Sequence, residues 1–182
     1  MDVMILTGAG QIGMAIARRI GYGMKIVIGD KRMENAVQIA DTMNKAGFDT
    51  VTTEMDLASR SSILALIEKA KMYGDIKYLV NAAGVSPSQA SVGTILNVDL
   101  YGTAVLLEEV GKVIKSGGAG VTVSSQSGHR LPALGEDIER QLACTQTDEL
   151  LNLDVLQPQN IRDTLHAYQL AKRCNVKRVM AE

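Results

Sequence analysis

The sequence predicts an α/β fold in which helices cover both faces of a doubly wound parallel sheet. Three observations lead to this prediction. Short apolar or β-branched runs alternate with helix-length amphipathic segments as far as about residue 124. The first run passes directly into a glycine-rich turn. The alternation then stops at residues 128–160, where prolines and acidic helical pieces follow without an obvious strand. We therefore expect one domain over residues 1–182, with a helical insertion at residues 128–160.

The predicted strands are runs that are too short for a helix and rich in β-branched side chains. In chain order they are Val3–Leu6, Lys25–Gly29, Asp49–Thr53, Tyr78–Ala82 and Ala119–Ser124. Because helix-length segments separate these strands, the chain reads as successive βαβ units, and the sheet is expected to be parallel.

The predicted helices have apolar residues at helical spacing, as Ile12, Ile16 and Ile20 show for the first. Glycines follow several of them, as is common at helix ends. The expected helices are residues 12–20, 33–46, 59–73, 92–115, with Gly102 inside it, and 161–182. The insertion carries two acidic helical pieces, around Glu136–Leu142 and Thr147–Leu153, which indicate a helix-turn-helix arm.

The composition restricts the class of partner. The chain is 46% hydrophobic and 21% charged, which is ordinary for a globular chain with a sizeable core. Its net charge of −1 provides no general attraction to nucleic acid or anionic membranes. No apolar run reaches the ~18 residues that span a bilayer, and the N-terminus lacks a basic flank. Cys144 and Cys174 have neither metal nor redox spacing. We expect a cytoplasmic protein with reduced thiols and no nucleic-acid or membrane partner.

The glycine turn predicts a dinucleotide site because it follows a strand and opens a helix. In Gly8-x-Gly10-x-x-Gly13, the first glycine permits the tight turn and the second lets a pyrophosphate approach the backbone. The third lets helix and strand pack closely, and the helix N-terminus attracts the phosphates. A strand–helix turn without a ligand is the other interpretation. Flavin or methyl-donor nucleotides can also use such a turn.

Acidic residues after the second and third strands indicate how the adenosine end is bound. Asp30 can accept hydrogen bonds from ribose hydroxyls and repel a 2′-phosphate, which favours NAD over NADP. Lys31 and Arg32 can instead neutralise such a phosphate. Asp30 can also be a solvated turn residue or a helix cap. Asp56 can bind the adenine amine or, equally, cap the following helix.

Tyr168 and Lys172 are four residues apart in the last predicted helix and therefore share one face. An ammonium beside a phenol favours the phenolate form, so Tyr168 can donate or remove a proton as hydride is transferred. Without the glycine turn, the pair reads as a solvated helix face. Ser124 and Ser125 end the fifth strand, at the sheet edge where ligands of α/β proteins bind. Such a hydroxyl can hold a substrate oxygen, or it can cap local backbone.

Together these motifs resemble the short-chain dehydrogenase/reductase family. The matching segments, in the order of the family, are Thr7–Gly13, Asn81–Gly84, Ser124–Ser125 and Tyr168–Lys172. The resemblance implies a Rossmann fold and nicotinamide-dependent hydride transfer on an alcohol or ketone. It implies that Tyr168 is the acid/base and that Lys172 assists it and holds the nicotinamide ribose. Ser125 then orients the substrate oxygen, and the Asn81–Gly84 stretch borders the cofactor.

The residues expected to bind the cofactor come from the motifs and the resemblance together. They are Gly8, Gly10, Gln11, Ile12, Gly13, Asp30, Lys31, Asp56, Leu57, Asn81, Ala82, Ala83, Gly84, Tyr168 and Lys172. No metal site is expected, because His129 and His166 have no partners at metal-like spacing.

The sequence departs from the family pattern at four points. The glycine turn is one residue shorter than the commonest form, and Ala82 replaces the second asparagine of the Asn-Asn-Ala-Gly motif. Asp99 stands where the family has a further catalytic asparagine, so an ionised Asp99 near Lys172 is expected to anchor a relay water with altered charge. The fourth departure is the long interval between Ser125 and Tyr168.

The 43-residue interval between Ser125 and Tyr168, together with the short interval from Gly84 to Asp99, resembles the arrangement in the 3α-hydroxysteroid dehydrogenase/carbonyl reductase subgroup, in which the insertion contributes to subunit association. The resemblance implies a homodimer or homotetramer and a steroid or other bulky carbonyl substrate. It also implies two more strands and a substrate-covering loop after residue 182, so we expect part of a longer protein or a shortened relative. The alternative function is a non-catalytic dinucleotide-binding or oligomerisation module. A methyltransferase-like domain leaves Tyr168 and Lys172 unexplained.

Overall fold

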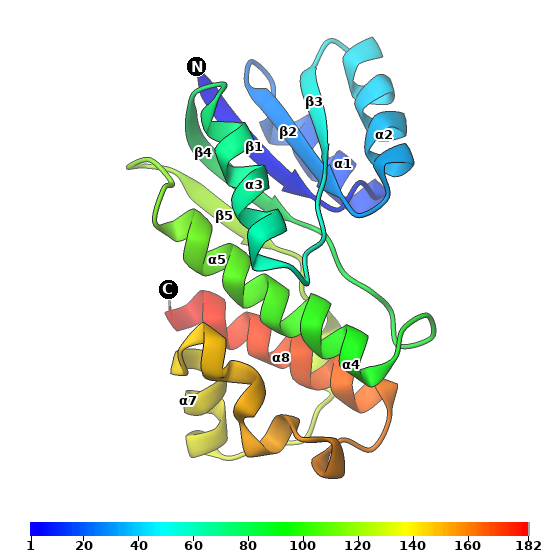
Figure 1. Cartoon of the computed structure of the whole chain (residues 1–182), viewed down its shortest axis with the longest axis vertical. Coiled ribbons are helices and arrows are strands. Elements are labelled where there is room, and N and C mark those ends of the chain that lie inside the picture. The colour runs from blue at the N-terminus through cyan, green and yellow to red at the C-terminus, as the bar shows by residue number, and fades with distance from the viewer. Residues whose placement is uncertain (182) are drawn as a thin grey trace. The chain divides into compact units, whose positions relative to one another are not determined.

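The computed structural model describes residues 1–181 and contains one five-stranded parallel sheet (Figure 1). The strands lie in the order β3-β2-β1-β4-β5. Their bounds are Asp2–Thr7 (β1), Lys25–Asp30 (β2), Asp49–Glu54 (β3), Asp75–Asn81 (β4) and Ala119–Thr122 (β5). The predicted fold class and all five predicted strands are therefore confirmed, although β4 starts three residues earlier than predicted and β5 ends at Thr122, two residues before the predicted Ser124.

The strand order reverses at β1, which lies between β2 and β4. In register, Thr7 at the end of β1 pairs with Gly29 of β2 on one side and with Asn81 of β4 on the other. The carboxyl ends of β1, β2 and β4 thus meet at one edge of the sheet. Ligands of open α/β sheets bind in the crevice outside such a switch point.

The chain folds into two compact units. The first consists of Met1–Ala83 and Glu109–Val123 and contains the whole sheet. The second consists of Gly84–Glu108 and the chain from Ser124 onward. The prediction that these residues form a single domain stays a prediction.

Three helices of the first unit follow strands: α1 (Gln11–Ile20), α2 (Met33–Lys45) and α3 (Arg60–Lys71). Alternate residues of β1 and β2, such as Leu6 and Ile28, pack in one cluster with Ala17 of α1 and Ala40 of α2. Leu66 of α3 lies against Gly29, whose place in the strand alternation puts α3 on the opposite face. Figure 1 shows α3 in front of the sheet and α1 behind it.

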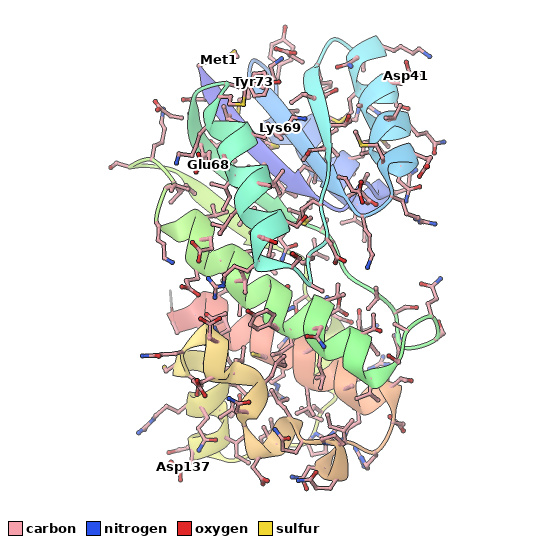
Figure 2. The ribbon with its side chains drawn as sticks, viewed as in Figure 1. Met1, Asp41, Glu68, Lys69, Tyr73 and Asp137 are labelled. Atoms are coloured by element: carbon pink, nitrogen blue, oxygen red, sulfur yellow. The ribbon has the colours of Figure 1, made fainter. Side chains whose placement is uncertain are left out.

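The solvent faces of these helices are polar, as their amphipathic patterns require. Asp41 of α2 and Glu68 of α3 are exposed and point away from the sheet (Figure 2). On the same helix as Glu68, Lys69 reaches back and donates a hydrogen bond of 2.7 Å to the Thr52 carbonyl of β3.

The second unit is helical, and its core is a cluster of buried residues that includes Leu100, Leu142, Leu150 and Leu170. Its elements, in chain order, are α4 (Val92–Ile95), η1 (Leu96–Gly102), most of α5 (Thr103–Gly111), α6 (Gln126–His129), α7 (Glu136–Cys144), η2 (Thr147–Asn152), η3 (Asp154–Leu156), η4 (Pro158–Asn160) and α8 (Thr164–Ala181). The predicted helical insertion before the Tyr168 helix therefore contains helices and no strand within the described chain.

Three helix predictions were wrong in detail. The expected single helix at residues 92–115 is α-helical at both ends, is π-helical over Leu96–Gly102, and stops at Gly111. The helix-turn-helix arm has only one α-helix, because α7 is followed by three short 3₁₀ turns. The last helix starts at Thr164, three residues later than expected. Within residues 1–181, no helix combines the length and apolarity needed to cross a membrane.

Candidate active site

The glycine turn joins β1 to α1, and its three glycines have three different surroundings. Gly8 has a positive φ of 84°, and a Cβ built on it would lie 2.5 Å from the Ala83 backbone nitrogen. A Cβ on Gly13 would lie 2.8 Å from a methyl carbon of Leu6, so this glycine permits the close packing of helix on strand. A Cβ on Gly10 would meet nothing within 4 Å, which leaves the backbone open to close approach.

The N-terminus of α1 has the features of an anion site. Gly10 is its N-cap and offers no side chain, and the first turn contains no acidic residue. Gln11 and Ile12 open the helix, and both are exposed. The N–H groups of this turn therefore remain available, and the helix dipole adds positive potential. The free N–H groups, the positive potential and the open backbone at Gly10 together suit the diphosphate of a dinucleotide.

Asp30 ends β2 beside this turn. Its two carboxylate oxygens accept hydrogen bonds of 2.8 Å, one from the Ala9 N–H and one from the Arg32 N–H. Asp30 thus ties the glycine turn to the start of α2. A carboxylate can accept about four hydrogen bonds, so this role leaves capacity for ribose hydroxyls. Ribose binding stays a prediction.

Asp56 does not cap α3, so that interpretation was wrong. The N-cap of α3 is Ser59, whose hydroxyl oxygen accepts from the Ser62 N–H. Asp56 instead accepts from the Ala58 N–H and pairs with Lys31, whose ammonium lies 2.8 Å from Oδ2. The Lys31 ammonium holds the pKa of the Asp56 carboxyl below its usual value. Lys31 is therefore already paired with a carboxylate, and the neighbouring Leu57 is buried.

The end of β4 lies against the end of β1. The Thr7 hydroxyl donates a buried hydrogen bond of 2.7 Å to the Asn81 side-chain oxygen, and the Ala82 N–H donates to the Thr7 carbonyl. Asn81 is 1% exposed. These bonds hold Asn81, Ala82 and Ala83 beside Gly8, and their predicted contact with a cofactor stays a prediction. Gly84, the last residue of this motif, begins the second unit.

The second unit brings three predicted residues together. Tyr168 and Lys172 lie one turn apart on α8, and the Lys172 ammonium is 5.4 Å from the centre of the Tyr168 ring. Asp99, from the π-helical segment, places Oδ2 4.0 Å from the same ammonium. Both charged side chains are buried, with 6% and 0% of their areas exposed. π-Helical turns often occur at functional sites, and this one supplies Asp99.

Backbone geometry around Gly84 supports the Asp99 carboxylate. Its Oδ1 accepts a hydrogen bond of 2.9 Å from the Val85 N–H. A Cβ on Gly84 would lie 2.9 Å from Oδ1 and 3.4 Å from the Lys172 ammonium, so glycine makes room for the pair. Oδ2 is buried and has no hydrogen-bond partner among the described residues. A buried carboxylate oxygen without a hydrogen bond is costly, even beside an ammonium at 4.0 Å, and it provides a place for a ligand hydroxyl or a water.

Burial pushes both members of this pair toward their neutral forms. It raises the pKa of the Asp99 carboxyl, against the opposing effects of Lys172 and the Val85 N–H. It lowers the pKa of the Lys172 ammonium, and the Asp99 carboxylate opposes that change. The two groups are thus brought closer in proton affinity, which suits a site that takes up and releases protons.

Ser124 and Ser125 were predicted to end the fifth strand, but they follow β5, which ends at Thr122, and both make hydrogen bonds with backbone groups. The Ser124 hydroxyl donates to the Lys172 carbonyl at 2.9 Å. The Ser125 hydroxyl oxygen accepts from the Ser127 N–H at 3.1 Å and caps α6. The capping interpretation therefore holds for Ser125, and its O–H remains able to donate to a substrate oxygen. That second role stays a prediction.

Sequence reasoning missed several residues that shape this site. The Val85 N–H binds Asp99, Gly128 packs against the α8 backbone, and Arg173 holds the segment after Ser125. Arg173 directly follows Lys172, but its sequence position does not distinguish it from a surface arginine. His166 accepts from the Arg162 N–H, and burial lowers its pKa. Within residues 1–181, His, Cys, Asp and Glu form no group of three that could hold a metal.

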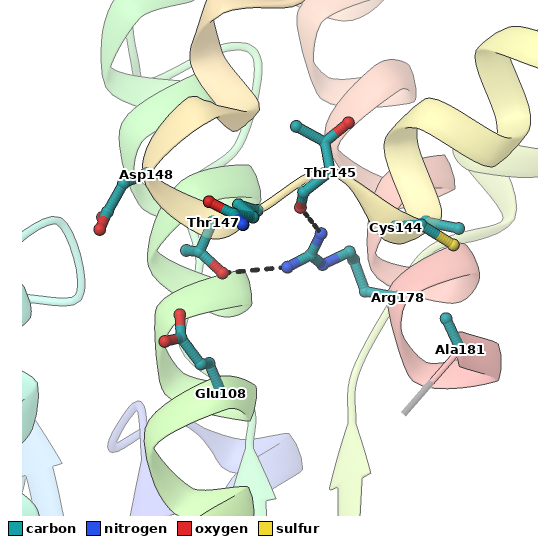
Figure 3. Close-up of a pocket in the computed structure, with 9 residues that line it drawn as sticks. Glu108, Cys144, Thr145, Thr147, Asp148, Arg178 and Ala181 are labelled. Atoms are coloured by element: carbon teal, nitrogen blue, oxygen red, sulfur yellow. Dashed lines mark hydrogen bonds between the residues drawn. The ribbon is translucent and has the colours of Figure 1, made fainter.

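A cavity of about 460 Å³ lies elsewhere in the second unit (Figure 3). Its described lining includes Glu108, Cys144, Thr147 and Arg178, and none of the predicted site residues. Arg178 is buried and donates to the Thr145 carbonyl and the Thr147 hydroxyl. The arginine thereby connects α8 to the segment that follows α7.

Comparisons with known proteins agree with this layout. The family model for short chain dehydrogenases matches residues 2–135. The short-chain dehydrogenase/reductase bsc3 of Alternaria brassicicola is 33% identical over 179 residues, which are 98% of this chain and 65% of that protein. The 7alpha-hydroxysteroid dehydrogenase of Bacteroides fragilis is 34% identical over 106 residues, 56% of this chain and 41% of that protein.

A solved structure shows the same fold. The 3-ketoacyl-ACP reductase of Sinorhizobium meliloti superposes with a TM-score of 0.70 and 21% identity, over 96% of this chain and 62% of that one. The chain thus spans less than two thirds of the length of these relatives. With the family model covering most of the chain and a relative matching nearly all of it, the chain belongs to the short-chain dehydrogenase/reductase family.

Proposed function

We propose that the chain carries the cofactor-binding and proton-transferring residues of an oxidoreductase that acts on an alcohol or ketone with NAD(H). The observation that carries the proposal is the grouping of Tyr168, Lys172 and Asp99 in the second unit. A buried ammonium between a phenol and a carboxylate serves proton transfer far better than it serves stability, because burying charges is costly.

A nicotinamide cofactor fits the first unit. The open backbone at Gly10 and the uncapped N-terminus of α1 would hold the diphosphate. Asp30 would accept from the adenosine ribose, and Asp56, which pairs with Lys31, leaves that lysine less free to bind a 2′-phosphate. These contacts favour NAD over NADP. The bound nicotinamide supplies or accepts the hydride.

The residues of the second unit then manage the proton. The Tyr168 hydroxyl donates its proton to the carbonyl oxygen during reduction and takes it back during oxidation. The Lys172 ammonium, close to the ring, stabilises the phenolate that forms. Asp99 holds this ammonium in place. Its Oδ2 can also anchor a relay water, although Asp99 carries a charge that the family's asparagine at this position does not. The Ser125 O–H orients the substrate oxygen.

The substrate is proposed to be a bulky apolar alcohol or ketone, such as a hydroxysteroid. Tyr168 packs against the apolar core of the second unit, as do Leu134, Leu153 and Val155 of the insertion. An apolar surround of this kind suits an apolar substrate. A relative that is named a 7alpha-hydroxysteroid dehydrogenase agrees with this class. We also propose that the protein is cytoplasmic and forms a homodimer or homotetramer. Analytical ultracentrifugation would test its oligomeric state.

The test follows reduced-nicotinamide absorbance with NADH or NADPH and a panel of ketones that includes a 3-ketosteroid. Tyr168→Phe is expected to abolish turnover and to leave cofactor binding nearly intact, because the ring and its packing remain. Turnover that persists in this variant would remove Tyr168 from the mechanism. Asp30→Ala is expected to reduce the preference for NADH, and an unchanged NADH/NADPH ratio would show that Asp30 does not set it.

A non-catalytic dinucleotide-binding module is the second candidate. The specific observation in its favour is the aspartate at position 99, whose charge can hold Lys172 in a salt bridge and disable the relay. In that case NAD raises the melting temperature, no ketone is reduced, and Asp99→Asn restores turnover. If Asp99→Asn is as inactive as the parent chain, Asp99 is not the reason for the inactivity.

A further inference from the structure

The segment that follows Ser125 is held against the helix that carries Tyr168. The Ser124 hydroxyl donates to the Lys172 carbonyl at 2.9 Å. Gly128, three residues beyond Ser125, packs directly on α8: a Cβ there would lie 2.9 Å from the Lys172 carbonyl carbon and from the Arg173 nitrogen. Ser125 thus lies between two points that touch the same turn of α8.

Arg173 closes this arrangement from the helix side. Its Nε donates to the Gly128 carbonyl at 2.8 Å, and its Nη2 donates to the Leu131 carbonyl at 3.1 Å. Its Nη1 donates to Glu139 of α7 at 3.0 Å. The side chain is 18% exposed, so these bonds are largely shielded from water. A planar guanidinium can serve three acceptors in fixed directions, whereas a lysine ammonium cannot reproduce that fork.

We propose that Arg173 is a positioning residue that fixes Ser125 relative to Tyr168 and Lys172. The inference rests on the proposed function, because it gives Ser125 and Tyr168 a shared substrate. The physical reason is that Arg173 belongs to the same helix as the acid/base pair. Its two carbonyl contacts therefore tie the Ser125 segment to the helix that carries those residues. A reacting group that shifts by about 1 Å can lose roughly 100-fold in rate.

Arg178 provides a matched control on the same helix. It is buried, whereas Arg173 is partly buried, and it likewise donates to a backbone carbonyl, that of Thr145, at 2.5 Å, and to the Thr147 hydroxyl at 3.0 Å (Figure 3). These acceptors lie after α7, in a segment without a predicted site residue. Replacing either arginine by lysine keeps the charge and removes the fork. The two variants then differ in the segment that is released and in the contact with Glu139, which only Arg173 makes.

The kinetic experiment compares Arg173→Lys with Arg178→Lys in ketone reduction. For Arg173→Lys we expect kcat to fall about 10- to 100-fold, with the cofactor dissociation constant and the ketone KM nearly unchanged. Arg178→Lys is expected to lower the melting temperature to a similar extent and to leave kcat near the parent value. Equal kcat values in the two variants would overturn the proposal.

A second readout needs no turnover and separates this inference from the proposed function. Amide hydrogen exchange, followed by mass spectrometry, is expected to speed up about ten-fold or more over residues 126–131 in Arg173→Lys. In Arg178→Lys the faster exchange is expected at residues 145–147 instead. Parent protein without turnover would refute the proposed function alone. Unchanged exchange over residues 126–131 in Arg173→Lys would refute the positioning role, whatever the turnover.

Discussion

The approach of the glycine turn to the end of β4 can be tested by Gly8→Ala. Gly8 has a φ of 84°, in the left-handed region that disfavours residues with a Cβ. The added Cβ would lie 2.5 Å from the Ala83 nitrogen, 2.6 Å from its Cα and 2.7 Å from the Ala82 carbonyl carbon. All three neighbours are backbone atoms, so no side-chain rotation can relieve the contact.

The expected cost has two parts. The left-handed conformation costs an alanine about 1–2 kcal/mol. Overpacking against the backbone of Ala82 and Ala83 adds about 1–3 kcal/mol, because the ends of β1 and β4 must separate. The free energy of unfolding is therefore expected to fall by roughly 2–5 kcal/mol. For a chain of this size, that corresponds to a melting temperature about 5–15 °C lower.

Gly23→Ala is the matched control for this measurement. Gly23 also has a positive φ, of 77°, but a Cβ there would meet nothing within 4 Å. It pays only the conformational cost of about 1–2 kcal/mol, or about 2–6 °C. Thermal unfolding followed by circular dichroism measures both variants. If Gly8→Ala melts at the same temperature as Gly23→Ala, the contact with Ala83 does not constrain the turn, and this reasoning is wrong.

Three further predictions concern titrating groups. Burial raises the pKa of the Cys174 thiol from 9.0 to about 12, so native protein should expose one reactive thiol, the exposed Cys144, to a thiol reagent at neutral pH; two fast thiols would contradict this. Asp56→Asn frees the Lys31 ammonium and is expected to raise the affinity for NADPH by about three-fold relative to that for NADH. Both affinities can be measured by titrating the protein into reduced cofactor and following cofactor fluorescence, because the chain contains no tryptophan that would interfere. Burial raises the pKa of the Asp99 carboxyl above its ordinary value of 3.8. Its contribution to the free energy of unfolding is therefore fully present below pH 3.8 and is lost as pH rises through the folded-state pKa. As pH rises from 3.8 through the folded-state pKa of Asp99, the free energy of unfolding should therefore fall more steeply for the parent chain than for Asp99→Asn. Parallel dependences of the free energy of unfolding on pH would exclude this contribution.

Most elements of the fold could be predicted because their signals are local. Val3–Leu6 and Lys25–Gly29 are apolar runs whose burial requires a sheet covered on both faces, and β1 and β2 contain them. The glycine turn was predictable from its place between a strand and a helix. The π-helical segment was not, because the sequence at residues 92–115 shows ordinary helical spacing and nothing local marks an extra residue in a turn.

Side-chain pairing was less predictable than the positions of the elements. The Asx turn of Asp56 and the cap of Ser59 lie three residues apart, and either residue type is a good cap, so propensity alone could not choose between them. Ser59 is the cap because α3 begins at Arg60, and only the structure shows where this helix begins. The pairing of Asp56 with Lys31 likewise required β2 and β3 to lie side by side.

The order of strands and helices along the chain, the glycine turn between the first strand and helix, and the position of Tyr168 and Lys172 on one helix face could all be predicted from the sequence, since each depends on residues close together in the chain. The surroundings of these residues depend on how distant segments pack in the fold. This packing brought Asp99 to 4.0 Å from Lys172 and buried both, and it placed Arg173 on the carbonyls of Gly128 and Leu131. Burial and contacts between distant segments change the cost of a charge and the position of a hydroxyl, and neither is encoded by spacing along the chain.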